Sequence, residues 1–304
     1  MEPKEGSEKL LRVTADFVFK HIFGSEKHER ILVSLLNSIL QGEPEIEAVE
    51  IYNSDVPRSR ENGKDIRLDI LARTSRGTII NIEIQCRNCD DIINRAIFYQ
   101  NRLMPQELEA GQNYNDIADI ISIWITDFIV FSDRKHYLNE ITDVVVANDI
   151  DPMKVGTKKF RILMLELKKI TYTIGNIKME HMDMLRLWMT FIKHPETIPE
   201  DIINQVPEIG EAMAELKKIS GDKNFRIQYD AYLMAKNDRI ADETTATRRG
   251  MEKGIEKGLK RGEEGKAKKI ALSMLKKGLS QNIVVECTGL SEEEVLKLGT
   301  KYLK

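Results

Sequence analysis

Two stretches of alternating apolar and polar residues, joined by a short turn, constrain the fold of this chain more than any other feature. Residues 66–73 and 79–85 alternate with a period of two, which is typical of β-strands that bury one face. The three-residue loop between them has Gly77 in its last place, which favours a type I turn followed by a G1 bulge. The chain must therefore contain an antiparallel hairpin, and with it a β-sheet.

The alternation also predicts which residues of the hairpin share a face. A turn centred on Arg76 places Asp69 opposite Glu83, with Asn81 and Gln85 on the same polar side. A shift of one residue would move every side chain of a strand to the other face, so the register decides whether the two carboxylates meet. The sequence therefore predicts two carboxylates that face each other across neighbouring strands.

Facing carboxylates have two interpretations, and the residues alone leave both open. Two such groups repel, and each raises the pKa of the other unless a cation lies between them. Hard oxygen ligands without supporting His or Cys suit Mg²⁺, which binds through one or two carboxylates plus a substrate phosphate. The alternative is a solvent-exposed hairpin whose outer face simply carries Asp, Asn, Glu and Gln.

Helical periodicity surrounds the hairpin, so the pattern as a whole predicts an α/β fold. We expect helices at residues 14–24, 25–42, 90–103, 184–193, 209–219 and 225–240. We expect further strands at residues 117–131, 142–147 and 160–167.

The C-terminal tail carries a glycine at every fourth position. The repeat consists of Gly250, Gly254, Gly258 and Gly262. Each glycine costs a helix about 1 kcal/mol relative to Ala, which favours a flexible basic linker-helix. The alternative is a helix whose glycine stripe contacts a partner helix.

Three short helices are expected beyond the repeat, at residues 267–277, 280–287 and 291–298. The segment Thr288-Gly-Leu-Ser resembles the corner of a helix-turn-helix. The helix after this corner begins with Glu292, Glu293 and Glu294, whose charge repels phosphate. We therefore expect an interaction or structural bundle here rather than a reader of DNA sequence.

Charge and composition exclude several classes of protein. The net charge is −3, yet residues 248–277 hold eleven Lys or Arg against four Asp or Glu, so a basic segment follows an acidic body. The longest charge-free run, residues 31–42, is shorter than the about 20 residues of a membrane helix. Three cysteines and a polar first segment predict reduced thiols, a cytoplasmic location and no signal peptide.

The residues of the hairpin resemble a known nuclease core. Asp69, followed across the turn by Glu83-Ile-Gln85, is similar to the core of the PD-(D/E)xK nuclease superfamily. The order and spacing of further segments resemble one branch, the recombination-promoting nuclease / transposase family, at residues 16–24, 64–72, 82–85, 95–99, 111–114, 123–128 and 187–191 and in the glycine repeat. The resemblance covers nearly the whole chain. It implies a restriction-endonuclease-like core, a central mixed sheet flanked by helices, with an α-helical C-terminal region.

The resemblance also implies a DNA endonuclease that depends on Mg²⁺ or Mn²⁺. Asp69 would be the central metal ligand and Glu83 the second ligand. Gln85 stands where the superfamily usually has a Lys, and an amide can neither supply a positive charge nor act as a base. Gln85 can only hold a water or a phosphate oxygen by hydrogen bonds.

Five further residues are candidates for accessory roles. Lys20 or Lys64 would restore the missing positive charge. Asp16 either forms an ordinary i,i+4 pair with Lys20 or reaches the metal as a helix-borne acid. Arg95 and Tyr99 share a helix face beside the hairpin, where they either contact phosphate or cap the core.

We therefore expect a nuclease-like domain over residues 1–240, with a helical extension from about 180, and a basic helix with a small bundle over residues 241–304. One hypothesis is an endonuclease acting in recombination, mobile-element activity or defence. The other is a weak or inactive nuclease fold that serves as a DNA- or protein-binding assembly module. The C-terminal region would mediate homo-oligomers. Sequence-independent DNA contacts are expected from Arg248, Arg249, Lys253, Lys257, Lys260 and Arg261.

Overall fold

A computed structural model of the chain divides into two compact units, Met1–Arg226 and Ile227–Lys304, each of which is described by itself. The expected boundary near residue 240 lies inside helix α7 (Lys223–Lys276). The structure describes residues 9–41, 43–52, 55–56, 66–88, 90–103, 113, 117–142, 145–146, 153–154, 160–170 and 183–302.

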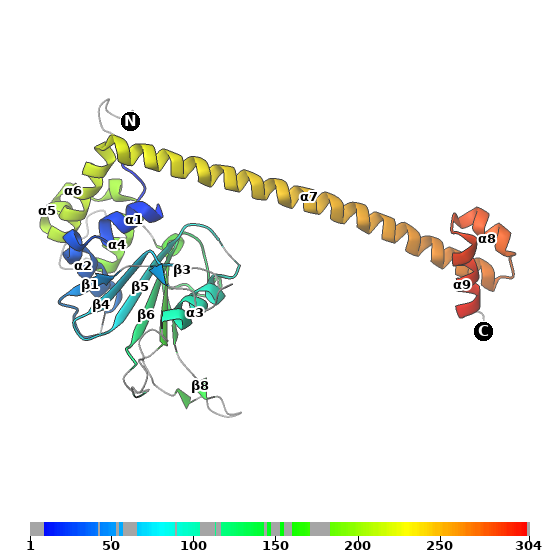
Figure 1. Ribbon diagram of the computed structural model, residues 1–304, viewed down its shortest axis with the longest axis horizontal. Coiled ribbons are helices and arrows are strands. Elements are labelled where there is room, and N and C mark those ends of the chain that lie inside the picture. The colour runs from blue at the N-terminus through cyan, green and yellow to red at the C-terminus, as the bar shows by residue number, and fades with distance from the viewer. Residues whose placement is uncertain are drawn as a thin grey trace. The chain divides into compact units, whose positions relative to one another are not determined.

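Among the described residues, six strands of the first unit form one mixed sheet (Figure 1). β5, β6 and β10 run parallel at its centre, and the remaining strands pair antiparallel on both sides. The order across the sheet is β1 (Val49–Tyr52), β4 (Ile70–Thr74), β5 (Ile79–Gln85), β6 (Ile120–Thr126), β10 (Phe160–Glu166) and β7 (Leu138–Thr142). Two short ladders pair β2 (Asp55–Val56) with β3 (Ile66–Arg67) and β8 (Val145–Val146) with β9 (Met153–Lys154).

The predicted hairpin is present in the predicted register. Ile70 lies opposite Ile82 and Ala72 opposite Ile80, and Gly77 takes a positive φ of 85° in the turn. The first strand is shorter than predicted, because the chain leaves the ladder at Asp69. The Asp69 N–H donates to the Glu83 side chain instead of to a backbone carbonyl of β5.

Helices cover both faces of this sheet, which confirms the predicted fold class (Figure 1). α3 (Ile92–Leu103) lies on one face, against Trp124 of β6 and Ile162 of β10. The other face carries α1 (Asp16–Phe23), α2 (Glu29–Ile39), α4 (Met184–Lys193), α5 (Glu200–Gln205) and α6 (Pro207–Gly221). Short 3₁₀ helices lie between these elements, at η1 (Glu26–His28), η4 (Leu167–Lys169) and η6 (Pro195–Thr197).

Because β5 lies between two strands and two helical layers, both of its faces are buried. Asn81 is 0% exposed and Glu83 is 4% exposed, although both lie on the polar side of the hairpin. The interpretation of this side as a solvent-exposed outer face is therefore wrong. The sequence pattern of the hairpin could not show it, because the covering layer is α3.

The strands after α3 differ from the predicted ranges. β6 ends at Thr126 rather than near residue 131. The range of the strand expected at residues 142–147 holds the last residue of β7, Thr142, and the short strand β8 at Val145–Val146. The buried Glu166 carboxylate explains the early end of β6, because it accepts hydrogen bonds from the N–H groups of Val130 and Phe131. The N–H groups of Val130 and Phe131 thus donate to a side chain of β10 and do not extend the β6 pairing.

In the second unit, all four glycines of the repeat lie inside the single helix α7. Exposed i,i+4 ion pairs such as Arg248–Glu252, at 2.8 Å, contribute a few tenths of a kcal/mol each to this helix. Apart from the flanking residues and the backbone of the helix itself, no described atom lies within 4 Å of a Cβ placed at any of these glycines. Both interpretations of the repeat, a basic linker-helix and a helix that contacts a partner helix, place it in a helix, and the structure has a helix there.

The three helices expected at the end of the chain form one small core. It consists of Ala271, Val284, Leu290 and Val295. α8 (Gln281–Thr288) ends at Gly289, whose φ is +67°, and α9 (Glu292–Tyr302) begins with a capping box. In that box the Ser291 hydroxyl accepts the Glu294 N–H at 3.3 Å, and Glu294 accepts the Ser291 N–H at 3.2 Å. In the described part of the chain, none of the helices has both the length and the apolar character needed to cross a membrane.

Candidate active site

The C-terminal end of β5 brings together most of the predicted site residues. Glu83 and Gln85 lie on β5, and Asp69 lies just before β4 on the neighbouring strand. Arg95 and Tyr99 come from α3, which packs on the polar side of the hairpin. Asp16 and Lys20 belong to α1, on the other side of the sheet.

Asp69 and Glu83 are held together by reciprocal hydrogen bonds. The Asp69 N–H donates to Glu83 Oε1 at 3.2 Å, and the Ile84 N–H donates to Asp69 Oδ2 at 2.8 Å. Each carboxylate is therefore fixed by the backbone of the strand that carries the other. The two acids lie side by side because the ladder ends here and frees these N–H groups.

Burial raises the pKa of both carboxyl groups. The pKa of Asp69 is raised to about 6, first by burial and further by the negative charge of Asp16, while the Ile84 N–H, Lys20 and Arg95 oppose the rise. The pKa of Glu83 is raised well above its ordinary value by burial and by Asp69. A bound cation would relieve the repulsion between the buried Glu83 and the half-buried Asp69.

Arg95 brings positive charge to the polar side of the hairpin. Its Nε and Nη2 atoms donate to the Tyr99 hydroxyl at 3.1 and 2.9 Å, and Nη1 lies 3.5 Å from Gln85 Oε1. The guanidinium also lies 5.8 Å from the centre of the Trp124 ring. Its charge lowers the pKa of both Asp69 and Glu83 against the effect of burial.

The Gln85 amide is already engaged on both of its atoms. Oε1 faces Arg95, and Nε2 donates to the carbonyl of Arg87 at 3.2 Å. Next along the chain, the Cys86 thiol donates to the carbonyl of Thr14 at 2.9 Å, which ties the end of β5 to the segment before α1. The Gln85 side chain is thereby connected to Arg95, whose charge acts on both carboxyl groups.

The structure brings other predicted residues to the site to different degrees. Asp16 is exposed and Lys20 is half-buried, and both are close enough for their charges to change the pKa of Asp69. Lys64 lies outside the described residues. The basic side chains of the tail are exposed on α7, in the second unit, at Arg248, Arg249, Lys253, Lys257, Lys260 and Arg261.

Sequence reasoning did not assign a role to Asn81 in the site. Its side chain is fully buried, its Nδ2 donates to the Ser122 hydroxyl at 3.3 Å, and hydrogen bonding from Asn81 lowers the pKa of Glu83. Its position two residues before Glu83, on the same face of β5, is the signal that could have found it.

The donor set limits what cation this site can hold. In the described ranges no three or more His, Cys, Asp or Glu converge on one point, so Asp69 and Glu83 act as a pair. Oδ1 of Asp69 accepts no hydrogen bond from any described residue, which leaves it available to a ligand. Two carboxylates fit a hard divalent cation such as Mg²⁺, whose other ligands are water and phosphate oxygens.

Comparison with known protein families agrees with this geometry. The family described as "PD-(D/E)XK nuclease family transposase" matches residues 13–246, and the "Rpn/YhgA-like nuclease family, C-terminal HTH domain" matches residues 264–300. No curated protein and no solved structure matches the chain. The predicted family and the helix-turn-helix corner are thereby confirmed. The chain belongs to the PD-(D/E)XK nuclease family transposases, the recombination-promoting nuclease branch, and carries their C-terminal helix-turn-helix domain.

Proposed function

We propose that this chain is a DNA endonuclease that hydrolyses phosphodiester bonds with the help of Mg²⁺ or Mn²⁺, in recombination, mobile-element activity or defence. The observation that carries the proposal is the pair of half-buried Asp69 and buried Glu83, fixed by each other's backbone, with the pKa of both carboxyl groups raised. These two residues would hold the cation. When bound, a divalent cation polarises a phosphate and lowers the pKa of a bound water.

The surrounding residues would have separate roles. Arg95 would stabilise the negative charge that develops on the phosphate, since preorganised cations act strongly where water is excluded. Gln85 would hold Arg95 in place through its Oε1 atom. Lys20 would supply the charge that a Lys in the position of Gln85 supplies in other members of the superfamily, and its effect on the pKa of Asp69 supports this role.

DNA is the expected partner of both units. A helix-turn-helix domain suggests DNA binding, and the exposed cations of α7 would add affinity that does not depend on sequence and weakens with salt. The glutamates at the start of α9 would limit sequence readout, because Glu294 serves the capping box instead of a base.

The test is cleavage of supercoiled plasmid by the purified full chain. We expect cleavage with Mg²⁺ or Mn²⁺, none with EDTA, and none by the Asp69→Asn protein under either condition. The matched control is Glu45→Gln, which removes an exposed carboxylate of the same unit and should cleave like the wild type. Cleavage by Asp69→Asn at the wild-type rate would reject this site.

The engaged amide of Gln85 favours a second candidate, a catalytically weak or inactive nuclease fold that acts as an assembly module. It would bind DNA or protein and form homo-oligomers through the C-terminal region. This candidate predicts no Mg²⁺ binding by calorimetry, and oligomers that are lost when the residues after Thr247 are removed. A truncated chain that stays oligomeric would count against it.

A further inference from the structure

A groove of about 1160 Å³ opens beside the end of β5 in the first unit. Its walls come from the segment before α1, the end of β6, the end of α4 and the end of α6. The polar residues that line it include Lys9, Arg12, Asp127, Lys193, Glu196 and Lys217.

Two lining residues connect this groove directly to the candidate active site. The Asp127 N–H donates to the carbonyl of Gln85 at 3.0 Å. The carbonyl of Thr14 accepts the hydrogen bond from Cys86. The groove therefore begins where β5 ends, one residue beyond the strand that carries Glu83.

The described lining residues make the groove positive, because its four Lys or Arg outnumber its two Asp or Glu. Lys9, Arg12 and Lys217 are exposed and form no ion pair with any described residue. Of the two acids of the groove, Asp127 forms an ion pair with Lys193, and the exposed Glu196 lies 3.4 Å from His194. An anion in this groove would meet cations that no described acid neutralises.

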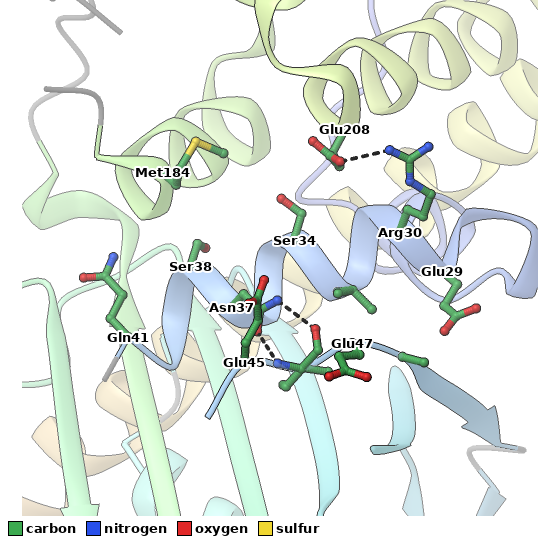
Figure 2. A pocket seen from close by; sticks show the side chains of 13 residues that line it. Glu29, Arg30, Ser34, Asn37, Ser38, Gln41, Glu45, Glu47, Met184 and Glu208 are labelled. Carbon is green, nitrogen blue, oxygen red and sulfur yellow. Dashed lines mark hydrogen bonds and ion pairs between the residues drawn. The ribbon is translucent and has the colours of Figure 1, made fainter. Parts of the chain in front are cut away.

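A second groove on the same unit has the opposite charge. It is lined by α2 and the segment before β1, and Figure 2 shows its glutamates around the helix. Glu29, Glu45, Glu47 and Glu208 line it, and its one lining cation, Arg30, pairs with Glu208 at 3.2 Å. The two grooves thus differ in the sign of their charge, and of the two only the positive one is lined by described residues that hydrogen-bond to the end of β5 or the residue after it.

We propose that the groove of Lys9, Arg12 and Lys217 binds the DNA backbone that flanks the phosphate held at Asp69 and Glu83. The proposal rests on the proposed function for the choice of DNA as the ligand. Its described lining residues include no Phe, Tyr or Trp on which bases could stack. It therefore contacts phosphates and not bases, and its contribution to affinity is the same for every DNA sequence.

The test is binding of the full chain to two fluorescent DNA duplexes of unrelated sequence, measured by anisotropy in EDTA over a series of salt concentrations. Arg12→Gln/Lys217→Gln should weaken binding about tenfold for both duplexes and reduce the slope of log affinity against log salt by about two. The control Lys27→Gln/Arg76→Gln removes two exposed cations elsewhere on the same unit, Arg76 being in the hairpin turn at the other end of β5. It should bind like the wild type.

A charge-preserving variant separates charge from folding. Arg12→Lys/Lys217→Arg should keep the wild-type affinity, because the groove supplies charge and not bidentate recognition. Equal affinity of Arg12→Gln/Lys217→Gln and its control would overturn the proposal, and so would a loss confined to one duplex. Weakened binding by a chain that never cleaves plasmid would leave the groove in place and reject only the endonuclease activity.

Discussion

Acidic side chains gather in two regions of the first unit, and only one of them has the chemistry of a metal site. In the groove beside α2, Glu45 and Glu47 are exposed and Glu208 is neutralised by Arg30 (Figure 2). At the end of β5, Glu83 is buried between the sheet and α3 with half-buried Asp69 beside it, and burial raises the pKa of both carboxyl groups. The exposed acids can be hydrated one by one, whereas Asp69 and Glu83 share one small space.

The comparison shows that burial and backbone hydrogen bonds, and not the density of acidic residues, distinguish the candidate site. Residues 43–50 contain four glutamates in eight positions, which is a higher density than the hairpin has. Water screens charges on such a surface, so their mutual effects are small. A substitution that neutralises one acid should therefore have large effects at the end of β5 and small effects beside α2.

The largest expected difference is in catalysis. Glu83→Gln should lower the rate of Mg²⁺-dependent plasmid cleavage about a thousandfold, because a metal ligand and several kcal/mol of transition-state stabilisation are lost. Glu47→Gln should leave the rate within about twofold of the wild type. Initial rates of plasmid nicking measure both, and circular dichroism checks that the variants fold. Similar losses in the two variants would remove the distinction between the two regions.

Arg95 should have the second largest effect. Arg95→Gln should lower the cleavage rate about a hundredfold, which is the usual cost of removing one stabilising charge from an active site. Because Arg95 lowers the pKa of Asp69 and Glu83, its loss should also shift the acid limb of the pH–rate profile to higher pH. The control Arg73→Gln changes a cation that stacks on Tyr52, outside the site. A reduced rate with an unmoved pH profile would indicate that Arg95 only supports the core.

Much of this site could be predicted from sequence because a hairpin is a local structure. Alternation and the position of Gly77 determine the register, and the register places Asp69 beside Glu83. The reciprocal hydrogen bonds could not be predicted, since they depend on where the ladder ends. The burial of Asn81 and Glu83 depends on α3 and on β6, a strand that pairs from about forty residues away in the sequence.

In the glycine repeat, local helix propensity alone gives too low an estimate of helix stability. Local propensity predicts that four glycines weaken a helix, yet α7 continues through all of them. Ion pairs at i,i+4 spacing and the good helix formers between the glycines act in the other direction. At the end of the chain, Gly289 and the Ser291–Glu294 capping box are strictly local signals, and the predicted corner is found where they lie.

A smaller expected difference is in stability. Burial raises the pKa of Asp69 from 3.8 to about 6, so the folded chain keeps a proton that the unfolded chain has lost between these values. Stability therefore falls as pH rises from about 4 to 6 and stays lower above that range. Asn at this position has no charge to bury, so Asp69→Asn should stabilise the first unit by about 2 kcal/mol at pH 8 and by little at pH 4.

Urea unfolding in EDTA, followed by Trp fluorescence, measures this effect, because both tryptophans, Trp124 and Trp188, are buried in the first unit. Glu47→Gln, the exposed control, should change the free energy of unfolding by less than about 0.5 kcal/mol at either pH. A destabilised Asp69→Asn protein at pH 8 would mean that the carboxylate stabilises the fold, and would contradict the cost that burial is expected to impose.

The smallest expected effect is the direct response to metal. At about ten times its dissociation constant, Mg²⁺ should stabilise the wild type by about 1.4 kcal/mol, which raises the melting temperature of the first unit by about 3 °C. The gain should be larger at pH 8 than at pH 5, because protons compete with the cation for Asp69 and Glu83. Glu45→Gln should keep the whole shift and Asp69→Asn should lose it. If Mg²⁺ stabilised the Asp69→Asn protein as much as the wild type, the cation would bind elsewhere, and the exposed glutamates beside α2 would become the better candidates.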